Sequence, residues 1–148
     1  MTIEPRTRPS FDPADRLAIE QRLAELLGAV AAERGIVTVY LYGSVARGTA
    51  GPRSDVDVAV LFATDPPRTL AGLHLDLQAD LEDALGLPVQ LVVLNRANAE
   101  LVHNVLMDSR LILDLDPAAR IDFEVARRRE YFDLLPILER YRRPERAT

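Results

Sequence analysis

The stretch Val37-Thr-Val-Tyr-Leu-Tyr-Gly-Ser-Val-Ala-Arg-Gly-Thr-Ala-Gly-Pro-Arg-Ser-Asp-Val-Asp-Val-Ala-Val-Leu61 decides the fold of this chain. Two runs rich in β-branched residues, 37–42 and 55–62, flank a loop rich in Gly, Ser, Thr and Arg, and each run is predicted to be a strand. Side chains of a strand alternate between its two faces, so Asp55 and Asp57 are expected to point the same way. The valines between and after them are expected to point the other way.

This pair of carboxylates suits a specific chemistry. Two like charges on one face repel each other unless a cation lies between them. Proteins hold Mg²⁺ with one or two carboxylates together with the oxygens of a substrate phosphate. Gly43 lets the backbone approach a ligand closely, and Ser44 is predicted to begin a short helix whose free N–H groups receive an anion. Either motif alone is common in turns and at solvated strand ends, but together they predict a site for a metal and a triphosphate.

The combination of Gly43-Ser-Val-Ala-Arg-Gly48 with Ser54-Asp-Val-Asp-Val58 resembles the signature of the DNA polymerase β-like nucleotidyltransferase superfamily. It is most similar to the small members called minimal nucleotidyltransferases, which act as antitoxins beside HEPN-domain ribonucleases. The resemblance extends over residues 37–141, and the Gly-Ser and Asp-x-Asp core is its most specific part. It implies an α/β (α+β) domain with helices packed on a small mixed β-sheet, and the order of the predicted elements indicates the same class.

The resemblance also implies roles for individual residues. Asp55 and Asp57 would hold Mg²⁺ or Mn²⁺ that bridges the phosphates of ATP, while Ser44 and the backbone after Gly43 would hold the terminal phosphates. Arg47 is a candidate phosphate contact because a guanidinium binds such oxygens through two hydrogen bonds; the alternative is an arginine that only lies on the surface. Catalytic roles thus fall on Gly43, Ser44, Asp55 and Asp57, and nucleotide contacts on Gly43, Ser44, Arg47 and Ser54.

The predicted third strand, Pro88–Leu94, departs from the family pattern at one position. Relatives commonly carry a third carboxylate there, and the matching residue of this chain is Gln90. An amide accepts a hydrogen bond, or coordinates a metal weakly, but it does not remove a proton from an incoming hydroxyl. Gln90 is therefore interpreted as a degenerate third position that weakens a second metal site; the alternative is that it simply faces solvent.

Composition limits the remaining function classes. The 148 residues, 48% of them hydrophobic, suffice for one domain with a substantial core. The net charge of −5 argues against broad nucleic-acid binding, since such binding depends on Lys and Arg. The absence of cysteine excludes disulfides and zinc–thiolate sites and fits a cytoplasmic protein, and neither a signal sequence nor a membrane-spanning run is predicted.

The first half of the chain outside the signature is predicted to be scaffold. Residues 1–11 are expected to form a flexible tail and residues 12–148 a single nucleotidyltransferase domain. A first helix is predicted to start at the Asp12-Pro13 cap and to end at Gly35. Its buried stripe is predicted to be Leu17, Leu23, Leu26, Leu27 and Val30, and its outer side Arg16, Glu20, Arg22 and Glu25. A second helix is predicted to run from Thr69 to Gly86, with five leucines on one face.

The last third is predicted to contain a third helix capped by Asn95 or Asn98, a short strand at 111–113, and a long helix that starts at Asp116-Pro117. Pro136 should kink or interrupt this helix. Its buried positions are predicted to include Ile121, Val125, Phe132, Leu135 and Leu138. Arg127–Arg129 are interpreted as a solvated face, with a surface that docks a partner as the alternative. His74 is interpreted as a surface or capping group rather than a ligand, and His103 as structural.

Three functions remain open at this level. The resemblance implies an antitoxin enzyme that transfers AMP from ATP to a tyrosine of a cognate HEPN toxin, within a hetero-oligomer. Gln90 favours the alternative of a catalytically weak or inactive member that neutralises its partner by binding. A third possibility is an aminoglycoside-type transferase for a small molecule, although the chain is short for a domain that would enclose one.

Overall fold

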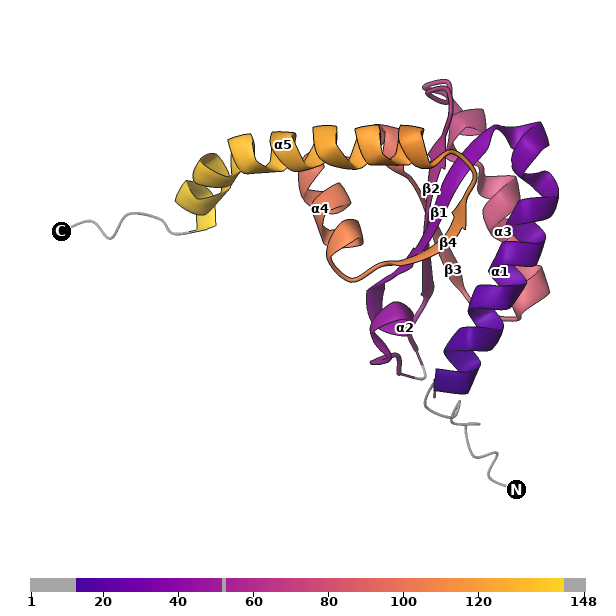
Figure 1. The fold of residues 1–148 in the computed structure, drawn as a ribbon. Coiled ribbons are helices and arrows are strands. Elements are labelled where there is room, and N and C mark those ends of the chain that lie inside the picture. The colour runs from indigo at the N-terminus through magenta and orange to yellow at the C-terminus, as the bar shows by residue number, and fades with distance from the viewer. Residues whose placement is uncertain (1–12, 52, 143–148) are drawn as a thin grey trace.

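The computed structural model describes residues 13–51 and 53–142. A four-stranded mixed sheet lies at its centre, with the spatial order β3-β2-β1-β4 (Figure 1). The predicted tail at residues 1–11, the cap at Asp12 and the last six residues lie outside the described residues. The strands are β1 (Ile36–Tyr42), β2 (Val56–Phe62), β3 (Val89–Val93) and β4 (Arg110–Asp114).

The signature stretch forms the two central strands and the loop between them, as its pattern predicts. β1 and β2 pair in antiparallel fashion, with Leu41 opposite Val58 and Tyr42 opposite Asp57. β3 pairs in parallel with β2, and β4 pairs antiparallel with the other side of β1. The loop contains the short helix α2 (Gly43–Arg47), and Asp55 immediately precedes β2.

Helices cover both faces of this sheet (Figure 1). α1 (Pro13–Arg34) and α3 (Leu75–Leu85) pack on one face, where they share an apolar cluster with Val56, Val58 and Val60 of β2. α4 (Ala99–Met107) packs on the opposite face with the start of α5 (Pro117–Arg142), over Ala59 and Leu61 of the same strand. The alternation along β2 therefore sends valine to one core and alanine and leucine to the other.

α1 forms where predicted, and Leu23 and Leu27 are fully buried. Two predictions about its faces are wrong. Leu17 is 53% exposed, because the buried stripe of the helix passes through Ile19, Leu23, Leu27 and Ala31 and leaves Leu17 to its side. Arg16 and Glu20 lie toward the domain rather than outside: Arg16 donates to the carbonyl of Ala46, and the Glu20 carboxylate pairs with Arg110 of β4.

The predicted second helix starts later than its leucine spacing suggests. The chain forms a 3-10 turn, η1 (Leu70–Leu73), and α3 begins only at Leu75. His74 between them adopts a left-handed conformation with φ of 51°, which breaks the helix. Its ring stacks on Phe62 with 4.3 Å between the ring centroids, and its Nδ1 accepts a hydrogen bond from Arg34 Nη1 at 3.1 Å. The side chain of His74 therefore packs between Phe62 and Arg34 and makes no hydrogen bond that caps α3.

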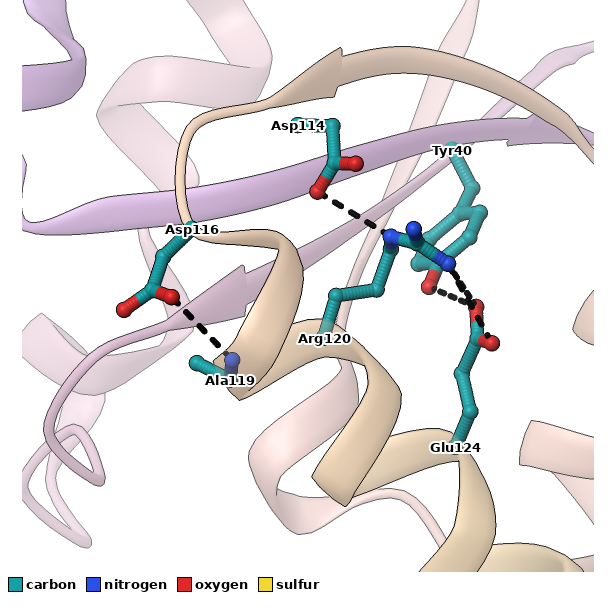
Figure 2. A network of polar contacts seen from close by, with 6 residues as sticks. All are labelled: Tyr40, Asp114, Asp116, Ala119, Arg120 and Glu124. Atoms are coloured by element: carbon teal, nitrogen blue, oxygen red, sulfur yellow. Dashed lines mark hydrogen bonds and ion pairs between the residues drawn. The ribbon is translucent and has the colours of Figure 1, made fainter.

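The last helices begin at the predicted caps. Asn98 accepts a hydrogen bond from the amide of Leu101 at 2.8 Å, which starts α4 after the 3-10 turn η2 (Leu94–Arg96). Asp116 accepts one from the amide of Ala119 at 3.1 Å, which starts α5 (Figure 2). α5 is not interrupted at Pro136, although its axis turns near its C-terminal end (Figure 1).

The predicted buried stripe of α5 is wrong. No described residue of this helix is buried, and Ile121, Val125 and Phe132 are exposed. Polar side chains anchor the helix (Figure 2), beside the half-buried Ala119 and Phe123 that pack on the apolar cluster of that face. Tyr40 of β1 donates a hydrogen bond to Glu124 at 2.7 Å, and Arg120 lies 3.0 Å from Asp114 of β4. α5 is thus held to the sheet at its first half and extends beyond it with its second half (Figure 1).

Candidate active site

Gly43 and Asp57 lie against each other in the candidate site. The pairing of Tyr42 with Asp57 brings the carboxylate of Asp57 beside the first residue after β1. Gly43 has φ of 75°, and a Cβ placed on it would lie 2.2 Å from Asp57 Oδ2. Glycine is therefore required here twice over, because of its backbone conformation and because Asp57 occupies the space of a side chain.

Asp55 and Asp57 are close enough to influence each other's charge. Burial raises the pKa of Asp57, the negative charge of Asp55 raises it further, and Arg47 opposes both effects. Asp57 is half-buried and Asp55 is exposed at the mouth of the site. Two adjacent carboxylates with open coordination sites fit a hard divalent cation that takes its other ligands from water or phosphate. Among the described residues no group of three or more His, Cys, Asp and Glu gathers to hold a metal.

The loop around these carboxylates is held by its own hydrogen bonds. α2 ends at Gly48, whose φ is 76°, and the backbone carbonyl of Ser44 accepts a hydrogen bond from the amide of Thr49 at 2.9 Å. Ser54 accepts one from the amide of Gly51 at 2.9 Å, so its hydroxyl closes the turn before Asp55. The side chain of Arg47 is exposed. The phosphate contacts predicted for Ser44, Arg47 and Ser54 stay predictions.

Gln90 lies next to Asp57. The parallel register pairs these two residues across β2 and β3, so both side chains are on the same face of the sheet. With Tyr42 on β1 they form a row across three strands. Gln90 is exposed, so it faces solvent and also stands beside the carboxylate pair. Its position is the one from which a third carboxylate would reach the same site.

Sequence reasoning overlooked Tyr42 as part of the site. Burial, assisted by the charge of Asp57, raises the pKa of Tyr42 to about 12, so its phenol is neutral near pH 7. The alternation along 37–42 does not give the pairing of Tyr42 with Asp57, so the sequence carried no direct signal for this residue. Arg127, by contrast, lies at the opposite end of the sheet, where it donates to the carbonyl of Asn95 at 3.2 Å.

The fold and the carboxylate pair define a class of protein. The family model described as polymerase beta, nucleotidyltransferase matches residues 25–118, which include the whole of the candidate site. The chain therefore belongs to the polymerase beta nucleotidyltransferase family. Among curated proteins, none matches this chain in sequence with significance.

Within the family the chain is similar to minimal nucleotidyltransferases. One solved structure, of a protein assigned as a minimal nucleotidyltransferase, is 32% identical; the match covers 70% of this chain and 98% of that chain, with a TM-score of 0.53. A chain of a toxin–antitoxin complex solved with AMP-PNP is 23% identical, with 84% and 98% covered and a TM-score of 0.66. A chain of a complex between tri-AMPylated HEPN toxin and MNT antitoxin of Shewanella oneidensis is 20% identical, with 86% and 99% covered and a TM-score of 0.64.

No helix of the described residues is both long enough and apolar enough to cross a membrane.

Proposed function

We propose that this chain is an antitoxin enzyme that transfers AMP from ATP, with Mg²⁺ or Mn²⁺, to a tyrosine of a cognate HEPN toxin. The observation that carries the proposal is the pair Asp55 and Asp57, with Asp57 packed against Gly43. Similarity to chains from toxin–antitoxin complexes, one with AMP-PNP and one with an AMPylated toxin, supports the nucleotide and the partner.

Different residues of the chain would have different roles in this reaction. Asp55 and Asp57 would hold the metal, which when bound neutralises the negative charge of the phosphates. Ser44 and Arg47 would hold the terminal phosphates so that they leave in line. The tyrosine oxygen forms a bond to the α-phosphorus while the bond from this phosphorus to the bridging oxygen breaks. AMP then remains on the tyrosine and pyrophosphate leaves.

The proton of the tyrosine hydroxyl passes to water in this scheme. Gln90 stands where a third carboxylate would accept that proton, and its amide is not a base. We therefore expect slow transfer. A Gln90→Asp variant should transfer AMP faster than the natural chain, because it restores a proton acceptor beside Asp57.

Gln90 also favours a second candidate function, a binding antitoxin that neutralises its toxin by covering it. In that case the chain keeps the fold and the partner but not the transfer. Gln90→Asp would then add no activity. The two functions make opposite predictions for one experiment.

That experiment is intact mass spectrometry of the cognate HEPN toxin after incubation with this chain, ATP and Mg²⁺. The test variant is Asp55→Ala/Asp57→Ala. A matched control is Asp80→Ala/Asp83→Ala, which removes two exposed carboxylates from α3, on the other face of the sheet. The proposal expects the toxin to gain the mass of one or more AMP units with the natural chain and the control, and none with the test variant. No gain with any of them, together with a stable complex, would establish the binding antitoxin.

A further inference from the structure

A hollow of about 490 Å³ lies directly beside the candidate site. One wall is made by Tyr42, Gly43 and Arg47, at the end of β1 and in α2. The other wall is made by α4 and the second half of α5, including His103, Asn104 and Tyr131. Gly43 therefore contacts the Asp57 carboxylate on one side and lines this hollow on the other.

The hollow opens on the face of the sheet that carries the chemistry. Along β2, Val56 and Val58 belong to the core under α1 and α3, whereas Ala59 belongs to the core under α4 and α5. Asp57 alternates with the valines, so it points to the α4 and α5 face. A ligand whose phosphates lie at Gly43 and Arg47 can therefore extend its other end toward α4 and α5.

The walls on that side combine flat apolar surfaces with one exposed amide. The rings of His103 and Tyr131 stack with 3.7 Å between centroids and an interplanar angle of 3°, which joins α4 to α5. Met107 lines the same wall and is 65% exposed, so its thioether is available for contact. Aromatic rings and thioethers contact nucleobases favourably, and the amide of Asn matches the N6 and N7 edge of adenine with one acceptor and one donor.

The acceptor tyrosine of a toxin would approach from elsewhere. Gln90, beside which the incoming hydroxyl is expected, lies on the edge strand β3 and does not line the hollow. The hollow lies on the other side of Asp57, next to β1 and α4. The hollow therefore lies away from the expected path of the acceptor tyrosine, so it is free to bind part of the nucleotide.

We propose that this hollow binds the base and ribose of the nucleotide and that Asn104 selects adenine. The inference rests on the proposed function, because it assumes that phosphates lie at Gly43. The remaining walls, including Arg47, belong to the phosphate end of the same ligand.

The test is the affinity of the full chain for Mg-ATP, Mg-GTP and inorganic triphosphate, measured by titration calorimetry. Asn104→Ala should lower the affinity for ATP about tenfold and leave the affinity for triphosphate unchanged. It should also bring the ratio of ATP to GTP affinity close to one. His103→Ala should lower the affinities for ATP and GTP by the same factor and leave the affinity for triphosphate unchanged. Gln21→Ala, which removes an exposed amide from α1, is the matched control and should change none of these values.

The possible results separate this inference from the function on which it rests. Unchanged ATP affinity and selectivity in both Asn104→Ala and His103→Ala would overturn the base site while leaving a nucleotide-binding enzyme intact. An equal loss of triphosphate affinity would also overturn it, because the hollow would then hold phosphates. If the natural chain bound neither ATP nor triphosphate, the proposed function and the inference would both fall. Asn104 is exposed, so its alanine variant is expected to fold, and thermal unfolding checks this for His103→Ala.

Discussion

On the face of the sheet under α1 and α3, the side chains of β2 are covered from solvent along the whole strand. On the face under α4 and α5 they are covered along only part of it. We call these the closed face and the open face. On the first face every inward residue of β2, from Val56 to Phe62, is buried in one apolar cluster. On the second face Ala59 and Leu61 are buried, but Asp57 in the same row stays half open.

This difference separates stability from chemistry. The closed face removes a continuous apolar surface from water, which is the main favourable contribution to folding. The open face lacks such burial at one end, where the row of Tyr42, Asp57 and Gln90 lies. Polar contacts, such as the hydrogen bond from Tyr40 to Glu124, help to hold α5 on this face. Variants of residues on the two faces test this division.

Removal of the same side chain from each core tests the division directly. Leu27→Ala, in the cluster under α1, should lower the free energy of unfolding by about 4–5 kcal/mol, near the top of the range for buried leucine. Leu94→Ala, in the smaller cluster on the other face, should cost about 2–3 kcal/mol, because fewer buried neighbours surround the cavity. Urea unfolding measures both. A larger loss for Leu94→Ala would contradict the comparison.

Gly43→Ala should affect the open face alone. The added Cβ overlaps Asp57 Oδ2 and forces the carboxylate to move, so AMP transfer should fall roughly 100-fold. Gly48→Ala is the matched control, since Gly48 has nearly the same positive φ but nothing within 4 Å of a new Cβ. Both variants should lose about 1–2 kcal/mol of stability through backbone strain. Equal transfer rates in the two would show that Asp57 does not need its place against Gly43.

Tyr40→Phe tests the polar anchor of α5. Loss of the hydroxyl leaves the carboxylate of Glu124 without its 2.7 Å hydrogen bond in a half-buried position, at a cost of about 1–3 kcal/mol. Tyr42→Phe, two residues along the same strand, is the control. The Tyr42 hydroxyl makes no hydrogen bond to a described residue, so the cost should stay within about 0.5 kcal/mol. Thermal unfolding compares the two. Equal costs would mean that the Tyr40 hydroxyl does not anchor α5.

His74 should make the closed face sensitive to acid. Burial lowers the pKa of His74, the charge of Arg34 lowers it further, and Asp76 opposes both. The unfolded chain therefore binds the proton first as the pH falls through about 6.5, and the folded state loses stability relative to it. His74→Asn keeps a residue that tolerates positive φ and removes the titration, so its stability should fall less between pH 7 and pH 5.5. Parallel stability curves for the two proteins would exclude this role.

The features that the sequence predicts best are those set by short, contiguous stretches of residues. β1, the loop and β2 follow from β-branched runs and a Gly-Ser pair, and the alignment that singles out Gln90 agrees with its register beside Asp57. The break at His74 could not be predicted, because the leucine spacing continues through it while the contacts with Phe62 and Arg34 come from distant segments.

The orientation of α5 escaped prediction for a related reason. Helical periodicity identifies Ile121, Val125 and Phe132 as one stripe but does not reveal whether another element covers it. In the described structure that stripe is exposed, and the helix is held through the ion pairs of Arg120 and through Phe123, which lies off the stripe. The hollow beside Gly43 was equally out of reach, since it exists only where α4 and α5 meet the end of β1.

The loop that precedes Asp55 and Asp57 is also the connection between β1 and β2, two strands that are neighbours in the sheet. Such a hairpin joins residues close in sequence, and contacts of this kind form early in folding because little chain entropy is lost in closing them. The hollow, in contrast, needs α5, which follows β4 and lies far along the chain from β1. We therefore expect hydrogen exchange during refolding to protect β1 and β2 before α5. An intermediate between these stages would have its carboxylate pair in place, but not yet the hollow that we propose for the nucleobase, so it would lack selectivity between nucleotides.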